Sequence, residues 1–235
     1  MVCSLTCCWT QGAIWHLATE LSKLHDGLLR LEIYSDILEQ QMLQYIEEIK
    51  SFNAIHNIVN TSDDEELAVR HILDSLAAAP HIARLATSFH SPYIADIGSG
   101  GGLPGIPLAA AFPQYTFTLV ERMTTRAGFL QQCVQSLNLQ NVQVRTAQAE
   151  EIPAASFDIA TFRAFRPLDK KIIRILLRII RKNGCLAAYK ARHEKIAEEM
   201  SAIHNQVPRY KVIPLTVPFL EDHERNLVVI QKRPR

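Results

Sequence analysis

The sequence predicts an α/β fold in which an N-terminal helical extension precedes a doubly wound, mostly parallel sheet of seven strands. Two observations carry this prediction. Apolar residues recur every three or four positions over the first 75 residues, and seven short apolar runs follow from residue 93 onward. Helical stretches separate most of these runs, and strands that alternate with helices form parallel sheets covered on both faces. A chain of 235 residues can bury the core that such a sheet needs.

Helices are predicted at the N-terminal end of the chain. Over residues 17–31 and 37–49 the apolar side chains fall on one face of a helix. A further helix is predicted to begin at the hydroxyl pair at 61–62, because hydroxyl caps and the four acidic residues that follow stabilise a helix N-terminus. We expect this helix to run to about Ala78 and to end before Pro80.

Strands are predicted at seven apolar runs, which occupy residues 93–97, 115–120, 142–144, 157–162, 185–189, 210–215 and 226–231. The clearest helices between them are Thr125–Asn138 and Leu168–Lys182. A loop joins the last two runs, so we expect them to form an antiparallel hairpin at one sheet edge, with the last strand antiparallel. We therefore divide the chain into a helical extension, residues 1–80, and an α/β domain, residues 81–235.

The composition excludes several classes of protein. With 48% hydrophobic and 21% charged residues the chain is not expected to be disordered, and no apolar run approaches the roughly 18 residues of a membrane span. The first residues carry no Lys or Arg before their apolar stretch, so we predict no secretory signal and a cytoplasmic location. The five cysteines have neither disulfide-framework nor zinc-site spacing, and no metal site is predicted.

The formal net charge of +1 hides a strong polarity along the chain. Residues 1–75 contain 4 basic and 12 acidic residues, whereas residues 122–192 contain 13 basic and 4 acidic residues. A basic half of this kind is typical of proteins that bind phosphates, because Lys and Arg release counterions from a polyanion. Solvated helix faces, balanced by the acidic half, would give the same charge distribution.

The most informative segment is DIGSGGGLPG at 96–105, which follows a predicted strand and opens a helix. Nucleotides bind at this position of a parallel sheet. A phosphate-binding Walker loop would end in Gly-Lys-Ser/Thr, which is absent here. A dinucleotide fingerprint fits only through Gly100, Gly102 and Gly105, two residues late after the strand.

A third interpretation takes the segment as the acidic-GxGxG loop of class I methyltransferases, which have a Rossmann-like fold and bind S-adenosylmethionine. Asp96, Gly98, Gly100 and Gly102 supply the pattern. This ligand carries a sulfonium and an ammonium and no phosphate, so a carboxylate beside the loop attracts it. Two further acids follow the next strands: Glu121 suits the ribose hydroxyls, as in NAD sites, and Glu150 lies where the adenine would be. Three acids at successive strand ends favour the methyl donor over a dinucleotide.

Several motifs together resemble one family of such enzymes. They are RHILDS at 70–75, DIGSGGGLPGIPLA at 96–109, FTLVER at 117–122, RAF at 163–165 and RNLVVI at 225–230. From about Ile49 to its C-terminus the chain closely resembles the RsmG family, also called glucose-inhibited division protein B. The resemblance implies methylation of a guanosine N7 in small-subunit ribosomal RNA, with S-adenosylmethionine as donor. The family's cofactor contacts then fall on Gly98, Leu103, Ala149, Glu150 and Arg163. One departure is Asn57-Ile58-Val59, where the family often has Asn-Leu-Thr.

The segment after the fourth predicted strand contains no general acid or base. It also lacks the Pro-Pro-aromatic motif of amino-group methylation, and Cys133 and Cys185 fit core thiols better than nucleophiles. Guanine N7 has a free lone pair and no proton, so its attack on a sulfonium methyl group requires orientation and no base. Our hypothesis is that Arg163 is the catalytic residue, orienting cofactor or guanine. Phe162 or Phe165 would stack on the target base, with core packing as the alternative for both.

Six basic residues are expected at the carboxyl edge of the sheet, where the donor would lie. We predict RNA contacts for five of them, Arg122, Arg126, Arg166, Lys190 and Arg192, in addition to Arg163. The basic stripe of the helix at 168–182 fits a solvated face equally well. His71 and Asp74 lie three residues apart on one helix face and fit either a catalytic pair or a docking role.

The sequence thus predicts an enzyme that methylates a guanosine N7 in small-subunit rRNA, free or in an assembling small subunit. No membrane contact and no obligate protein partner are predicted. Two alternatives stay open at this point. One is a small-molecule methyltransferase or NAD-dependent oxidoreductase on a Rossmann-like fold, and the other is a non-catalytic RNA-binding module.

Overall fold

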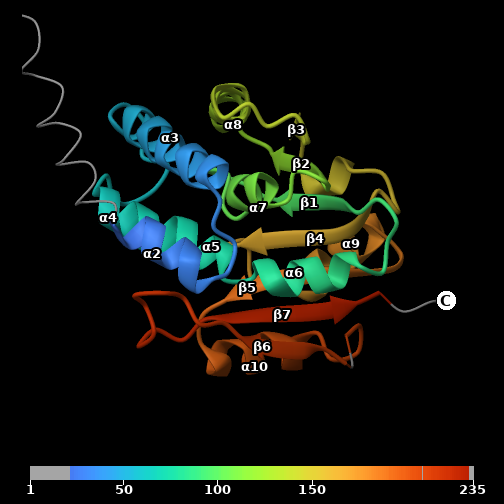
Figure 1. Cartoon of the computed structure of the whole chain (residues 1–235). Coiled ribbons are helices and arrows are strands. Elements are labelled where there is room, and N and C mark those ends of the chain that lie inside the picture. The colour runs from blue at the N-terminus through green and yellow to red at the C-terminus, as the bar shows by residue number, and fades with distance from the viewer. Residues whose placement is uncertain (1–21, 208, 233–235) are drawn as a thin grey trace, which may run out of the picture.

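Seven strands form one sheet in the order β3-β2-β1-β4-β5-β7-β6 (Figure 1). The structure, a computed structural model, describes residues 22–207 and 209–232. The strands are β1 (Tyr93–Ile97), β2 (Thr116–Glu121), β3 (Val142–Thr146), β4 (Phe157–Arg163), β5 (Ile180–Lys190), β6 (Lys211–Pro214) and β7 (Asn226–Gln231). The pairs among β1 to β5 are parallel, whereas β7 is antiparallel to both β5 and β6. The predicted fold class and edge hairpin are therefore confirmed.

The strand register places the functional segments at one edge of the sheet. Ile97, the last residue of β1, pairs with Val120 near the end of β2, and Asp96 pairs with Thr161 near the end of β4. The parallel strands therefore end side by side, and the segments that leave β1, β2 and β4 share the carboxyl edge. The strand order reverses between β1 and β4, which is the position where open α/β sheets bind ligands.

Helices cover both faces of the sheet, because neighbouring residues of each strand point to opposite faces. In β1, Ile94 joins the core beneath α6 (Ala79–Ala86), α7 (Gly105–Ala111) and α8 (Thr124–Ser136). Ala95 joins the second core, beneath α9 (Lys170–Ile179) and α10 (His193–Ala202). A short 3-10 turn, η2 (Ala149–Glu151), follows β3. Cys133 and Cys185 are buried in the first core, as predicted.

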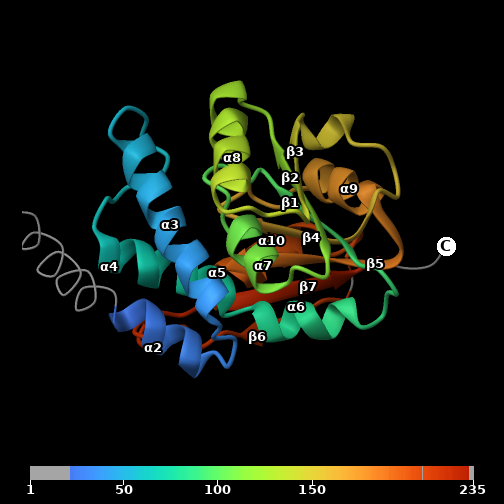
Figure 2. The same ribbon diagram turned by 45° about the horizontal axis from the view of Figure 1, so that its top comes forward.

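The N-terminal helices lie together beside α7 in both ribbon views (Figures 1 and 2). They are α2 (Ser22–Arg30), α3 (Asp36–Asn53), α4 (Asp64–Leu67), the π-helical segment η1 (Ala68–Leu73) and α5 (Asp74–Leu76). Their apolar faces belong to the same core as Ile94 and Phe117 of the sheet. The division at residue 80 stays a prediction. Leu17 and Leu21 of the first predicted helix, and Cys3, Cys7 and Cys8, lie outside the described residues.

Three details of the predicted helices differ from the structure. The cap at the start of α4 is Asp63, whose carboxylate accepts a hydrogen bond from Glu66 N at 2.7 Å, and not the hydroxyl pair at 61–62. Pro80 lies at the start of the next helix, α6, where a proline loses no hydrogen bond. The helix predicted to reach Lys182 ends at Ile179, because Ile180 already pairs with Phe157 in the sheet.

One helix was missed entirely, since α10 follows β5 where no helix was predicted. Its pattern is weak, with two buried residues, Ile196 and Met200, along ten positions. None of the described helices is long and apolar enough to cross a membrane.

Candidate functional site

The glycine loop leaves β1 at the carboxyl edge and leads into α7. Gly98, Gly100 and Gly102 have φ angles of 72°, 55° and 91°, which side chains with a Cβ adopt only at a cost. Gly98 N and Ser99 N donate to the carbonyl of Val120 at 2.8 and 3.1 Å, so the loop is tied to the end of β2. The segment predicted to approach a ligand closely has the backbone conformation that the prediction requires.

Two of the predicted acids hold this loop in place. Asp96 Oδ2 accepts a hydrogen bond from Gly105 N at 3.0 Å. Glu121 accepts one from Gly100 N at 3.0 Å and another from Met123 N at 2.9 Å. Both side chains are buried, with exposed fractions of 1% and 4%. The backbone amides at each end of the loop are therefore fixed by carboxylates from adjacent strands.

Asp96 lies beneath the loop and does not line a described cavity. Its Oδ1 atom is buried and has no hydrogen-bond partner in the described part of the chain. Burial raises the pKa of Asp96 to about 7, although the hydrogen bonds from Gly105 and Ser99 act in the opposite direction. The carboxyl group therefore exchanges its proton near neutral pH. Its predicted contact with the cofactor stays a prediction.

A cavity of about 320 Å³ opens above the loop, and we call it the glycine-loop cavity. Its walls come from the ends of β1 and β2 and from the segments after β3 and β4: Ile97, Gly98, Val120, Glu121, Arg122, Met123, Arg126, Ala147, Gln148, Ala149, Ala164, Phe165 and Arg166. Three predicted cofactor residues, Gly98, Glu121 and Ala149, line it directly. Four others, Gly100, Gly102, Leu103 and Glu150, belong to the adjoining segments and do not line it.

The ring of Phe165 lies over Gly98 at the mouth of this cavity. A Cβ atom added at Gly98 would stand 2.7 Å from the ring, so the close approach depends on glycine. Arg166 lies over the same ring at 5.3 Å and contacts Glu150 at 3.4 Å, while Glu150 Oε2 is buried without a partner. Phe162 is 1% exposed and belongs to the core beneath α9, so core packing is confirmed for Phe162.

A second cavity, of about 430 Å³, lies on the other side of the β4 exit, and we call it the Arg163 cavity. Arg163 Nη1 donates to Asp74 Oδ2 at 2.9 Å, and Arg225 Nε donates to Asp74 Oδ1 at 2.7 Å. Asp74 is 6% exposed and thus neutralises two partly buried guanidinium groups. Ala164 lines both cavities, so they meet at the segment that carries Arg163 and Phe165.

His71 faces Arg163 and does not pair with Asp74. Arg163 Nη2 lies 3.4 Å from His71 Nδ1, and an arginine can only donate, so Nδ1 acts as the acceptor and the neutral ring carries its proton on Nε2. Burial, with the charge of Arg163, lowers the pKa of His71 to about 4. His71 is therefore neutral at physiological pH, and both Asp74 oxygens are already used by arginines. This geometry favours a docking role over a catalytic His-Asp pair.

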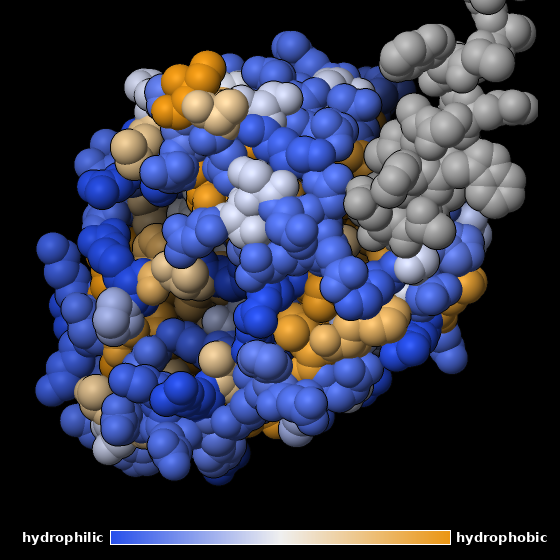
Figure 3. Space-filling model, turned by 90° about the vertical axis from the view of Figure 1, so that its left-hand side faces the viewer, coloured by the Kyte–Doolittle hydropathy of each residue, from blue (hydrophilic) through white to orange (hydrophobic). Residues whose placement is uncertain are grey.

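The predicted RNA contacts divide between the two cavities. Arg122, Arg126 and Arg166 line the glycine-loop cavity, and Lys190 lines the Arg163 cavity, where it pairs with Glu199 at 2.7 Å. Arg192 is exposed at the start of α10 and lines neither. The space-filling view toward this edge shows hydrophilic side chains around a hollow with apolar atoms at its floor (Figure 3).

Two site residues were missed from the sequence. The buried Tyr45 hydroxyl, from α3, donates to the carbonyl of Gly101 and so braces the glycine loop from the helical extension. Arg225 was noted only as part of a motif, although its spacing from RHILDS was not informative. Ile58 and Val59, where the chain departs from the family, pack near Gly101 with apolar side chains.

A family model described as "GidB: rRNA small subunit methyltransferase G" matches residues 38–228. The chain is 40% identical to a ribosomal RNA small subunit methyltransferase G of Treponema denticola over 214 residues, covering 80% of this chain and 84% of the relative. It is 35% identical to the protein of the same name from Neisseria meningitidis serogroup B over 199 residues, covering 85% and 91%.

Solved structures of methyltransferases share the fold. The tRNA (m1A58) methyltransferase TrmI of Aquifex aeolicus superposes with a TM-score of 0.52 at 16% identity, covering 69% of each chain. The carbon methyltransferase CurJ superposes with a TM-score of 0.57 at 11% identity, covering 95% of this chain and 70% of that one. At these identities the likeness concerns the fold alone.

Proposed function

This chain belongs to the GidB family of small-subunit rRNA methyltransferases, and from that premise we propose that it transfers the methyl group of S-adenosylmethionine to N7 of a guanosine in small-subunit rRNA. The observation that carries the proposal is the pair of cavities that meet at Ala164. One is formed by the glycine loop and acids, and the other by arginines. A methyl donor and an anionic acceptor require this division.

The glycine-loop cavity fits S-adenosylmethionine by its chemistry. Glu121 offers carboxylate oxygens to ribose hydroxyls, and Ile97, Val120 and Ala149 offer apolar surface to the adenine. Two buried carboxylate oxygens, on Asp96 and Glu150, are without partners in the described part of the chain. Buried polar atoms are nearly always hydrogen-bonded, so these oxygens suit the amino groups of such a ligand. When bound, S-adenosylmethionine supplies a methyl group on a sulfonium, which is an electrophile.

The Arg163 cavity suits an acceptor that needs no deprotonation. Its acid, Asp74, is occupied by two arginines, and its histidine, His71, is neutral. Guanine N7 presents a lone pair in the plane of the ring, so holding that nitrogen in line with the methyl group is sufficient for the reaction. Arg163, fixed by Asp74 beside the junction of the cavities, is positioned for this orientation. Phe165 offers an aromatic face at the same junction.

Methyl transfer is tested with the purified full chain, labelled S-adenosylmethionine and small ribosomal subunits from cells that lack the enzyme. We expect label in the rRNA and N7-methylguanosine in its nucleoside digest by mass spectrometry. Label in another nucleoside would overturn the N7 assignment, and no label in free rRNA, partly assembled subunits or full subunits would overturn the activity.

Donor identity is tested separately by thermal unfolding. S-adenosylhomocysteine at about 100 times its Kd should stabilise the chain by about 2.7 kcal/mol, and NAD should not stabilise it. The reverse result would favour the oxidoreductase alternative. We further propose that the enzyme works in the cytoplasm, where its ribosomal substrate is assembled.

A further inference from the structure

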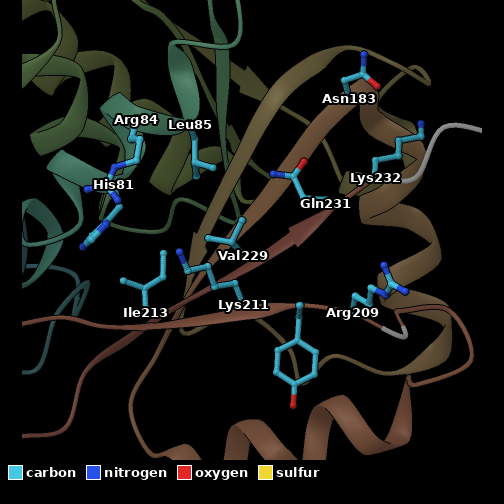
Figure 4. Close-up of a pocket in the computed structure, with 11 residues that line it drawn as sticks. His81, Arg84, Leu85, Asn183, Arg209, Lys211, Ile213, Val229, Gln231 and Lys232 are labelled. Atoms are coloured by element: carbon cyan, nitrogen blue, oxygen red, sulfur yellow. The ribbon is translucent and has the colours of Figure 1, made fainter.

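A third hollow lies between α6 and the β6–β7 hairpin, away from both cavities described above (Figure 4). It has a volume of about 550 Å³ and an apolar floor that includes Leu85, Ile213 and Val229. We call it the basic groove, after the five basic side chains around that floor: His81, Arg84, Arg209, Lys211 and Lys232. The proposed function uses none of them.

The groove lies toward the opposite edge of the sheet from the methylation site. Gln231, which lines the groove, pairs with Cys185 near the start of β5, whereas Tyr189 and Lys190 at the end of β5 line the Arg163 cavity. Five residues of strand separate Cys185 from Lys190, a distance of about 17 Å at the usual rise of a strand. One mononucleotide cannot occupy both places, but a folded RNA can.

The charges of the groove are not balanced by the chain itself. Its lining residues include no Asp or Glu, whereas the glycine-loop cavity contains Glu121 and the Arg163 cavity contains Asp74. In the described residues Arg84, Arg209 and Lys211 form no ion pair, although ten other basic groups, among them Arg30 with Glu221, do so. A cluster of like charges without counterions is stabilised by an anion.

His81 adds an independent observation. Its Nδ1 atom is inaccessible to solvent and has no hydrogen-bond partner in the described part of the chain. Burial and the neighbouring charges of Arg84 and Lys211 lower its pKa, so the ring is neutral and offers one donor and one acceptor nitrogen. A buried ring nitrogen without a partner is unusual and is consistent with a ligand that supplies one.

We propose that the basic groove anchors the phosphodiester backbone of a second segment of small-subunit rRNA, distinct from the methylated loop. This inference rests on the proposed function, because that function brings the chain to rRNA. The surface between the groove and the Arg163 cavity carries Glu32 and Glu221, so the groove is a separate anchor and not the end of a continuous basic track. Lys and Arg side chains give RNA affinity through phosphates, independent of sequence.

An anchor remote from the reacting atoms contributes binding that is equal in the ground and transition states. It therefore lowers KM for the rRNA substrate and leaves kcat unchanged. Arg84 and Lys211 are both exposed, so reversing their charges leaves the core intact. For Arg84→Glu with Lys211→Glu we expect KM for small subunits to rise about 10-fold or more, kcat to stay within about twofold, and the salt dependence of binding to weaken by about one phosphate per residue.

The control is Lys171→Glu with Arg174→Glu, which makes the same charge change at exposed positions of α9. We expect its KM to change less than about threefold, on the grounds that α9 presents a solvated face. Equal losses in the two double variants would assign the effect to net charge and overturn the anchor. An unaltered KM in the groove variant would overturn it as well.

Two further substrates identify the partner. Binding of a stem-loop that contains only the methylated loop should be unchanged in the groove variant, and an equal loss there would overturn the assignment to a second segment. Binding of protein-free small-subunit rRNA should weaken as it does for the intact subunit, and a loss confined to the intact subunit would assign the groove to a ribosomal protein. Failure of the wild-type chain to methylate rRNA would instead count against the proposed function.

Discussion

The two cavities at the carboxyl edge are built in different ways. The glycine-loop cavity is fixed by backbone amides of one continuous segment, residues 98–105, which donate to Asp96, Glu121 and the end of β2. The Arg163 cavity is fixed by side-chain ion pairs that join Asp74 to Arg163 and Arg225, 89 and 151 residues away in sequence. The first geometry is a local property of the chain, and the second exists only once the fold has formed.

The largest expected effect tests the Arg163 cavity. Arg163→Ala removes the group that orients the acceptor, and we expect kcat/KM to fall about 1,000-fold, or about 4 kcal/mol of transition-state stabilisation. Asp74 keeps Arg225 as its partner, so the free energy of unfolding should fall by no more than about 1 kcal/mol. Steady-state methylation of small subunits and urea unfolding measure the two quantities.

Arg181 provides the matched control, since it also pairs with a buried aspartate, Asp158, at 3.0 Å, but at the start of β5. Arg181→Ala should reduce stability by a similar amount and leave kcat unchanged. Equal losses of activity in the two variants would mean that Arg163 supports the fold and not the reaction.

The second effect separates the cavities by pH. Asp96 keeps its proton to about pH 7 when folded but releases it near pH 3.8 when unfolded. The folded chain therefore binds more protons in this interval, and Asp96 makes stability fall as pH rises through it and stay constant above about pH 7. Asp96→Asn removes this contribution, so between pH 5 and pH 8 the wild type should lose of order 3 kcal/mol relative to the variant.

Urea unfolding of both chains at several pH values measures this difference. The titration of His71 acts in the opposite direction, because its lowered pKa makes stability rise with pH between about 4 and 6.5. That contribution is common to both chains and cancels in the comparison. Parallel stability curves would mean that Asp96 is ionised in the fold at pH 5.

The contrast between the cavities also explains what the sequence could predict. The strands, their order of use and the glycine loop follow from local patterns, and Gly98, Glu121 and Ala149 line the cavity they were assigned to. The partners of Asp74 could not be derived, because no pattern within RHILDS specifies which distant arginines it meets. Tyr45 was missed for the same reason: its spacing in α3 indicates a core position, and only the packing of α3 on the loop gives its hydroxyl a partner.

A third effect tests the backbone of the glycine-loop cavity. Gly98→Ala places a Cβ at a φ of 72° and 2.7 Å from Phe165, and we expect the Kd for S-adenosylmethionine to rise about 30-fold, or about 2 kcal/mol. Adding Phe165→Ala should restore only the part due to the contact. Gly128→Ala is the control, because nothing lies within 4 Å of a Cβ there, and it should leave the Kd unchanged. Calorimetric titration gives all the Kd values, and an unaltered Kd for Gly98→Ala would place the donor elsewhere.

The smallest effect compares two buried tyrosine hydroxyls, one for each cavity. Tyr45 donates to Gly101 O in the glycine loop, and Tyr189 donates to Ser75 O, next to Asp74, at 2.8 Å. Each Tyr→Phe change removes one hydrogen bond and leaves a carbonyl without its donor, at a cost of about 1 kcal/mol. Tyr45→Phe should therefore raise the Kd for S-adenosylmethionine about fivefold and leave KM for small subunits unchanged. Tyr189→Phe should leave that Kd unchanged and lower kcat/KM for small subunits by a similar factor. If both variants changed both quantities equally, the two cavities would be one cooperative unit, and the division between a backbone-built and a side-chain-built half would not hold.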